Sequence, residues 1–229
     1  MVEPVLVVKG LKKEFYEGVT TLTVFNNVNF TLFPNEMVAI MGASGSGKTT
    51  LLNIITGLEQ ATKGDVFIED YNIAEISDDI ASRIRRERLG LVFQDFNLLP
   101  HLTAEENVEI PLIFADIPEG ERKRLASKAI QRTDMTEKAN YYPNQLSGGE
   151  KQRIAISRAI VSNPPILLVD EPTGNLDSQT GKEIISLFRN IVDQEGMHAV
   201  LMTTHDPEAA QRADKIFLLQ SGELTEMKD

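Results

Sequence analysis

The sequence contains no cysteine, no tryptophan and only three histidines. Without cysteine, the chain has no disulfide framework and no cysteine-bound zinc site. It also lacks any apolar run that approaches the roughly 20 residues needed to span a bilayer. The first four residues do not show the basic start and apolar core of a signal peptide. We therefore expect a chain that does not insert into a membrane by itself.

Basic side chains are scarce as well, because 23 Lys and Arg residues stand against 34 Asp and Glu residues, giving a net charge of −11. Nucleic-acid binding requires a basic face, so we expect no nucleic-acid partner. Adhesion to anionic lipid is disfavoured for the same reason. If this protein works at a membrane, another subunit must hold it there.

The sequence does have a glycine-rich segment that fits the phosphate-loop pattern G-x-x-x-x-G-K-[ST]. An apolar strand at residues 37–41 precedes this segment and a helix follows it, so its backbone N–H groups and the helix N-terminus can point at phosphates. Lys48 adds a positive charge for the β/γ oxygens, and the Thr49 hydroxyl can ligate Mg²⁺. We expect the nucleotide to be bound by Gly42, Ala43, Ser44, Gly45, Ser46, Gly47, Lys48, Thr49 and Thr50.

A second glycine motif lies much further along the chain and consists of Ser147, Gly148, Gly149 and Glu150. Ser147 is a good N-cap, and the glycines leave first-turn N–H groups open to a ligand. Taken alone, this motif would indicate an ordinary capped helix. It is followed, however, by an apolar strand at residues 166–169 that ends in Asp170 and Glu171. Ligands bind at the carboxyl edge of a parallel sheet, so we expect both carboxylates at a site there.

These motifs, in this order, resemble those of the ATP-binding cassette (ABC) ATPases across essentially the whole chain. Residues 146–150 are similar to the signature of that family, residues 166–171 to its Walker B strand, and residues 174–177 to its D-loop. Gln94 matches the Q-loop glutamine and His205 the switch histidine. The resemblance implies an enzyme that binds ATP and Mg²⁺ and hydrolyses the ATP.

The resemblance also implies roles for single residues. Glu171 would be the general base that activates water, a contribution typically worth ~10²–10⁴-fold in rate. His205 would donate to the γ-phosphate or position the attacking water. Mg²⁺ would be held by Thr49 and Gln94 and, through water, by Asp170. The adenine would stack on Phe15, with Val24 near the ribose.

Glu150 departs from the family pattern, in which many members carry Gln. A carboxylate in the first turn suits the helix dipole, but it would repel a nearby γ-phosphate. We expect the Glu150 side chain to point away from the phosphate, and the signature to contact it through Ser147 and Gly149.

The resemblance further implies a homodimer in the ATP-bound state. One phosphate loop covers its nucleotide from one side, whereas the helix that begins at Ser147 has no phosphate of its own chain to bind. In the family, each ATP lies between the phosphate loop of one chain and the signature of the other, and Asp177 of the D-loop would connect the two sites. ATP binding would close the dimer, and hydrolysis would open it.

Three destinations for this motion remain open, namely a transmembrane permease subunit, nucleic acid and the ribosome. A single cassette with an acidic charge and no cysteine favours the permease, which would hold the chain at the cytoplasmic face of the cell membrane.

Residues 93–108 are similar to those of the lipoprotein-release, macrolide-export and FtsE-like ATPases. In their loop we expect Phe96, Leu98 and Leu99 to be exposed and to receive a helix of the partner, although packing into the helical region is the alternative.

The pattern of elements predicts an α/β fold, with a P-loop NTPase core, a mostly parallel sheet, an N-terminal antiparallel β layer and a helical subdomain. Strands at residues 5–8, 21–30 and 65–68 indicate the antiparallel layer. A capped helix is expected to begin at Thr103, and another to cover residues 119–132. From residue 166 onward strands alternate with helices expected at residues 179–194 and 207–212, which is typical of βαβ units. We expect one ABC ATPase domain over residues 1–229, with the core at 1–94 and 161–229 and the helical subdomain at 95–160.

Overall fold

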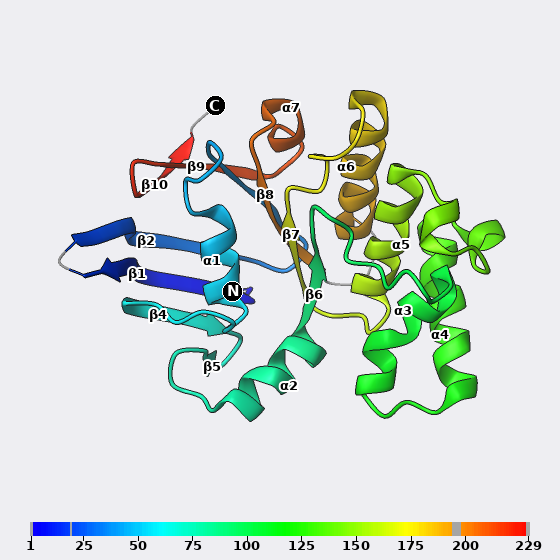
Figure 1. Cartoon of the computed structure of the whole chain (residues 1–229). Helices are drawn as coiled ribbons and strands as arrows, with labels where there is room; N and C mark the ends of the chain where they lie inside the picture. Colours follow the sequence, from blue (N-terminus) through cyan, green and yellow to red (C-terminus); the bar gives the residue numbers. More distant parts are fainter. Residues whose placement is uncertain (1, 19, 194–197, 228–229) are drawn as a thin grey trace.

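The computed structural model describes residues 2–18, 20–193 and 198–227. Figure 1 shows an antiparallel sheet on one side of the molecule, a second sheet in the centre and a group of helices on the other side. In these described residues, no helix is both long and apolar enough to cross a membrane. The α/β fold with an antiparallel layer and a helical region is confirmed.

The central sheet has the order β10-β9-β3-β8-β7-β6. Its strands pair in parallel except for β9 and β10, which form an antiparallel hairpin at the edge. The inner strands β3, β7 and β8 consist mainly of fully buried apolar residues, as expected for a parallel sheet that is covered on both faces. The strands are β3 (Met37–Met41), β6 (Leu89–Val92), β7 (Ile166–Asp170), β8 (Ala199–Thr204), β9 (Lys215–Gln220) and β10 (Glu223–Met227).

The antiparallel sheet has the order β2-β1-β4-β5 and packs with α1 (Lys48–Ile55) around one of two hydrophobic cores. Leu6 lies opposite Leu32 on one neighbouring strand and opposite Ile68 on the other, and all three side chains are fully buried. The first strand is much longer than the predicted 5–8, and β5 and β10 were not predicted. The strands are β1 (Leu6–Glu17), β2 (Thr20–Leu32), β4 (Lys63–Ile68) and β5 (Tyr71–Asn72).

The second core joins the central sheet to the helical region. The α3 helix begins where expected, because the Thr103 side chain accepts a hydrogen bond from the Glu106 amide and the Glu106 carboxylate accepts one from the Thr103 amide. The α7 helix ends at Ala210, two residues before the predicted end, and Gln194 of the predicted sixth helix lies outside the described residues. The helices are α2 (Asp78–Arg88), α3 (Ala104–Phe114), α4 (Glu119–Arg132), α5 (Gly148–Ile160), α6 (Ser178–Asp193) and α7 (Pro207–Ala210), with short 3-10 helices at Thr136–Lys138 and Pro143–Gln145.

The parallel strands bring three distant segments to one edge of the central sheet. The neighbours β3, β8 and β7 end at Met41, Thr204 and Asp170, and the Asp170 backbone lies in register with Thr203. Directly after β3, the Gly42 amide donates to the Thr204 carbonyl oxygen at 3.3 Å. The phosphate-loop pattern, the two carboxylates and His205 therefore meet at this carboxyl edge.

Candidate active site

The loop between β3 and α1 depends on its glycines. Gly47 has a φ of 100°, and an added Cβ there would lie 2.5 Å from Val24 Cγ1. An added Cβ on Gly42 would lie 2.7 Å from the Leu219 carbonyl oxygen, so larger residues are excluded at both ends of the loop. No side chain caps α1, so first-turn N–H groups are left open to a ligand. This arrangement suits an anion. Val24 lies against Gly47, and its place near the ribose stays a prediction.

Lys48 joins the loop to the predicted catalytic residues. Lys48 is 5% exposed, and its ammonium group donates to the carbonyl oxygens of Gly42 and Ala43 at 2.8 and 3.0 Å. The same Nζ atom lies 3.1 Å from Glu171 Oε1, while Glu171 Oε2 lies 3.0 Å from His205 Nδ1. The structure thus brings the phosphate lysine, the predicted general base and the switch histidine into one chain of contacts.

Glu171 itself adopts a backbone conformation that is uncommon for a residue with a side chain, with a φ of 43°. Its amide donates to the carbonyl oxygen of Thr203 at 3.1 Å, which ties the end of β7 to β8. From this backbone position, the Glu171 carboxylate contacts Lys48 and His205.

Thr49 and Asp170 provide oxygen atoms beside the loop. The Thr49 hydroxyl donates to Asp170 Oδ2 at 2.9 Å, and the Thr203 hydroxyl donates to Asp170 Oδ1 at 2.6 Å. Hydroxyl and carboxylate oxygens are ligands that Mg²⁺ accepts, directly or through its waters. Thr203 is a supporting residue that the sequence analysis did not single out, although a polar residue near the end of an apolar strand was the available signal.

Gln94 follows β6, and its side chain is exposed. Its backbone oxygen accepts a hydrogen bond from the Asn175 side chain at 3.1 Å, and Asn175 also donates to Asp95 Oδ1 at 3.0 Å. An added Cβ on Gly174 would lie 2.8 Å from Gln94 Nε2, so the amide packs closely on this glycine. The Q-loop and the D-loop segments are therefore in direct contact.

The signature motif begins α5 in the helical region. Ser147 Oγ accepts from the Glu150 amide at 3.3 Å, and Glu150 Oε2 accepts from the Ser147 amide at 2.8 Å. The backbone hydrogen bond from Ser147 is the main reason why the pKa of Glu150 is lowered. The Glu150 carboxylate therefore folds back over the helix start, and its orientation toward a phosphate stays a prediction.

Two further predicted residues lie apart from these contacts. Asp177 accepts hydrogen bonds from the Thr180 hydroxyl and amide at 2.6 and 3.0 Å, which lowers the pKa of the Asp177 carboxyl and caps α6. Phe15 is 39% exposed near the end of β1, with the Lys13 ammonium 4.5 Å from the centre of its ring. Partial exposure of the ring is compatible with stacking, and the role of Phe15 stays a prediction.

The loop after Gln94 differs from the prediction. Leu98 is half-buried and packs against the core of the helical region, and Phe96 is half-buried too, so only Leu99, at 41%, is exposed. The predicted exposed cluster was therefore wrong for two of its three residues. The reason is Asn107, which is fully buried and hydrogen-bonds the backbone of Leu99 from both sides, drawing the loop onto α3.

Comparisons with known proteins agree with this geometry. A model of the ABC transporter family matches residues 25–174, well over half of the chain. The uncharacterized ABC transporter ATP-binding protein MJ0796 of Methanocaldococcus jannaschii is 44% identical over 220 residues, covering 94% of this chain and 93% of that protein. The macrolide export ATP-binding/permease protein MacB of Shigella flexneri is 38% identical over 221 residues, which cover 96% of this chain but only 34% of MacB.

Solved structures give the same result. The dimeric structure of a post-hydrolysis state of the cassette MJ0796, bound to ADP and Pi, superposes with a TM-score of 0.87 at 40% identity and covers 98% of this chain and 99% of that one. The structure of CbiO1 of Clostridium perfringens, part of the transporter complex CbiONQ, has a TM-score of 0.86 at 26% identity and covers 97% and 87% of the two chains. The predicted resemblance, including its macrolide-export branch, is confirmed. The chain belongs to the ABC transporter family and is a nucleotide-binding, ATP-hydrolysing cassette associated with transport.

Proposed function

We propose that this chain forms a homodimer around two ATP molecules and drives a separate transmembrane permease subunit, in a system of the macrolide-export or mechanotransmission type. In such a system, the chain acts at the cytoplasmic face of the membrane through its partner. The observation that carries the proposal is a groove beside the active site whose chemistry fits a helix of a partner.

Hydrolysis follows from the contacts of this chain's own residues. Lys48 and the first-turn N–H groups of α1 bind the β/γ-phosphates, and Glu171 accepts the proton of the attacking water. His205 fixes the Glu171 carboxylate from the side opposite Lys48. Thr49, Asp170 and Gln94 are the residues that would hold Mg²⁺, which supplies charge neutralisation on the phosphate oxygens when bound.

The dimer is supported by the arrangement of the two glycine motifs. The phosphate loop belongs to the sheet edge, whereas Ser147 is exposed at the start of a helix in the helical region. The MJ0796 cassette, 40% identical over nearly its whole length, forms a dimer. A head-to-tail arrangement would use Ser147 and Gly149 of one chain to complete the phosphate site of the other.

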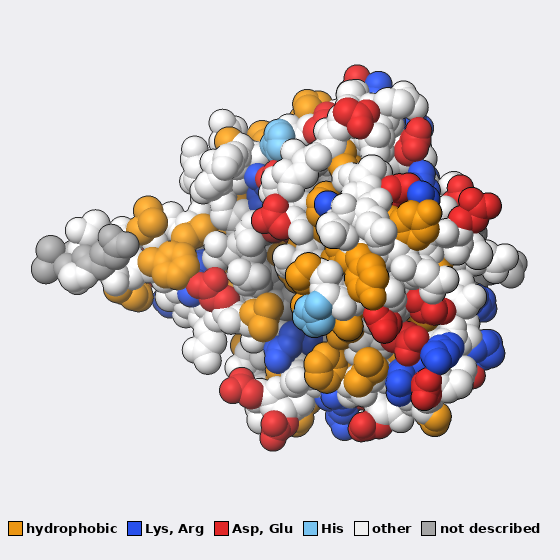
Figure 2. All heavy atoms as spheres, turned by 45° about the vertical axis from the view of Figure 1, so that its right-hand side comes forward, with side chains coloured by type: hydrophobic (Ala, Val, Ile, Leu, Met, Phe, Trp, Pro, Cys, Tyr) orange, Lys and Arg blue, Asp and Glu red, His pale blue; other side chains and the backbone are white. Residues whose placement is uncertain are grey.

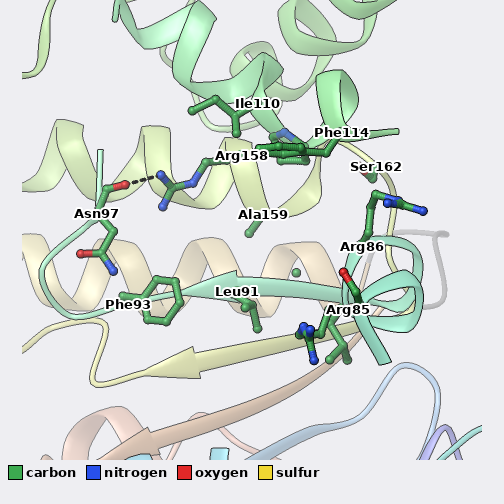
Figure 3. A pocket seen from close by; sticks show the side chains of 14 residues that line it. Arg85, Arg86, Leu91, Phe93, Asn97, Ile110, Phe114, Arg158, Ala159 and Ser162 are labelled. Carbon is green, nitrogen blue, oxygen red and sulfur yellow. Dashed lines mark hydrogen bonds between the residues drawn. The ribbon is translucent and has the colours of Figure 1, made fainter. Parts of the chain in front are cut away.

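The groove lies between α2, β6, α3 and α5 and encloses about 550 Å³. Figure 3 shows its apolar wall, to which Leu91, Phe93, Ile110 and Phe114 contribute. Arg85, Arg86 and Arg158 also line it, and of the described residues that line the groove none is acidic. In a chain with a net charge of −11, a basic groove with apolar walls favours an amphipathic helix that carries carboxylates on one face.

The surface around this groove agrees with a docking role. On the face that carries the helical region, Figure 2 shows apolar side chains gathered beside Lys and Arg side chains. Phe114, at the end of α3, is 69% exposed although it is a large apolar residue, and Ile113 next to it is 50% exposed. Exposed apolar residues at the rim of a groove often mark an interface.

The test is co-purification in detergent with candidate permease subunits that are co-expressed with this chain. Phe114→Ser should abolish co-purification and leave the ATPase activity of the isolated cassette intact. Leu58→Ser is the matched control, because Leu58 is 61% exposed but does not line the groove. If wild-type protein binds the permease and Phe114→Ser binds it equally well, the groove is not the docking site.

A further inference from the structure

Arg158 of α5 occupies an unusual position at the floor of the groove. Its guanidinium donates to the carbonyl oxygen of Asn97 at 2.5 Å and to that of Phe96 at 2.7 Å. Burial lowers the pKa of Arg158, and no carboxylate of the described residues forms an ion pair with it. Figure 3 shows the side chain reaching from α5 across the groove to Asn97. A half-buried cation is thus used to hold two backbone oxygens.

The two oxygens belong to consecutive residues in the left-handed conformation. Phe96 has a φ of 61° and Asn97 a φ of 49°. Asn tolerates this region, whereas a bulky residue such as Phe rarely adopts it unless its surroundings impose it. The planar guanidinium of Arg158 presents parallel donors that match two adjacent carbonyls. The turn is therefore stabilised from outside, by α5.

The same short segment is held from its other side by the residues that follow the catalytic carboxylates. Asn175 donates to the Gln94 backbone oxygen and to the Asp95 side chain, and Gly174 packs on the Gln94 amide. Residues 94–97 are consequently clamped between α5 and the D-loop segment. A shift of either clamp changes where the Gln94 side chain can lie.

The α5 helix connects this clamp to the signature. Arg158 lies eleven residues after Ser147, a distance of about 16 Å along a rigid helix. Since Arg158 also lines the groove, one residue contacts the Q-loop backbone, the helix of the signature and the place proposed for the partner.

We propose that Arg158 is a positioning residue for ATP hydrolysis. It holds the Phe96–Asn97 turn and thereby couples the position of the Gln94 side chain to the position of the α5 helix. The inference rests on the proposed role of Gln94 at Mg²⁺. It predicts that loss of the guanidinium fork loosens Gln94, so that more Mg²⁺ is needed for the same turnover, whereas the affinity for ATP without Mg²⁺ stays unchanged.

The experiment titrates Mg²⁺ against the ATPase rate of the full chain at saturating ATP, and calorimetry measures the ATP affinity of each variant with and without Mg²⁺. Arg158→Met should raise the Mg²⁺ concentration for half-maximal rate about 5-fold, within the range seen for residues that act at a distance. Arg158→Lys should stay close to Arg158→Met, since a point charge does not replace the fork. Arg83→Met is the control, because Arg83 on α2 is exposed and does not line the groove, and it should behave as wild type.

A rescue separates positioning from a general loss of structure. Glycine adopts the left-handed conformation without outside support, so Asn97→Gly in the Arg158→Met background should restore part of the Mg²⁺ response. Thermal melts of every variant identify any that fail to fold, and if Arg158→Met is one of them, Arg158→Lys serves as the test variant.

Gln94→Ala separates the inference from the proposal on which it rests. If Gln94→Ala leaves the Mg²⁺ dependence unchanged, the assigned role of Gln94 is wrong and the inference falls with it. If Gln94→Ala shifts the dependence but a folded Arg158 variant does not, the role of Gln94 stands and Arg158 is not a positioning residue.

Discussion

The start of α1 and the start of α5 are both glycine-flanked helix N-termini, yet they are satisfied in different ways. Before α1 stands Gly47, which has no side chain to cap the helix, and Lys48 lies beside the opening. Before α5 stands Ser147, and a reciprocal pair of hydrogen bonds with Glu150 closes the helix start. One terminus presents positive charge and open amides, and the other carries its own cap and a carboxylate.

This difference assigns different tasks to the two termini. In the proposed mechanism, the α1 terminus is an anion site that one chain completes, since the amides, Lys48 and the Thr49–Asp170 pair converge there. The α5 terminus by itself would bind an anion more weakly. The amides of Ser147 and Glu150 already donate hydrogen bonds within the cap, and the Glu150 carboxylate places a negative charge at the helix N-terminus. In the proposed dimer it would therefore add to a phosphate that is already held, instead of capturing one.

The largest effect is expected from Glu171→Gln, because Glu171 contacts Lys48 at the start of α1. The amide keeps the size of the side chain but cannot accept a proton, so the steady-state ATPase rate should fall by about 10²–10⁴-fold. ATP binding should be preserved, and the ATP-bound dimer should accumulate in size-exclusion chromatography. Glu223→Gln on β10 is the control. A turnover close to that of wild type would show that Glu171 is not the general base.

Lys48→Ala should have the next largest effect. Hydrogen bonds between charged groups contribute about 1.5–3 kcal/mol, so ATP affinity measured by calorimetry should fall by about 10- to 100-fold. Lys151→Ala on α5 changes the same residue type on the signature helix and should leave the affinity of the monomer unchanged. Equal losses of ATP affinity in the two variants would show that the two helix termini do not differ in nucleotide binding.

How far the sequence predicts this molecule depends on how local each feature is. Helix α4 has the predicted bounds (Glu119–Arg132), and the strand, loop and helix around Lys48 were predicted closely, because glycine, cap and apolar signals lie within a few residues. Strand β1 was predicted too short, because its second half contains lysines and pairs irregularly with β2 and β4. Its extension is decided by partner strands that a local pattern does not reveal.

In the candidate active site, too, the features with local sequence signals were predicted and the long-range contacts were not. Every predicted motif residue belongs to a short signature, and the structure brings Lys48, Glu171 and His205 together. The supporting contacts that sequence analysis did not predict act over long separations. Thr203 bonds a residue 33 positions away, Arg158 one 61 positions away and Asn175 one 81 positions away. Their types are ordinary, and only the fold makes them specific.

A smaller effect is expected from removing the cap of α5. Ser147→Ala and Thr103→Ala delete the same reciprocal cap from α5 and α3, and each should cost about 1 kcal/mol of unfolding free energy. Only Ser147→Ala should also weaken the ATP-driven dimer, measured in the Glu171→Gln background. If both variants lose stability and neither affects the dimer, Ser147 is merely a cap and the α5 terminus does not reach the nucleotide.

The smallest effect, and the one that most directly addresses the difference between the termini, is that of Glu150→Gln. Gln keeps the reciprocal cap and removes the negative charge, so the ATP-driven dimer in the Glu171→Gln background should tighten by about 2- to 5-fold. The Ser147 amide lowers the pKa of Glu150, and a carboxylate with a lowered pKa stays charged until the pH falls below its ordinary value of about 4.3. The gain in dimer affinity from Glu150→Gln should therefore be constant between about pH 6 and pH 8. Analytical ultracentrifugation at several ATP concentrations measures it.

A gain that shrinks as the pH falls from 8 to 6 would mean that wild-type Glu150 takes up a proton in that range. Its carboxylate would then lie against the phosphate in the dimer, instead of folding back onto its own helix.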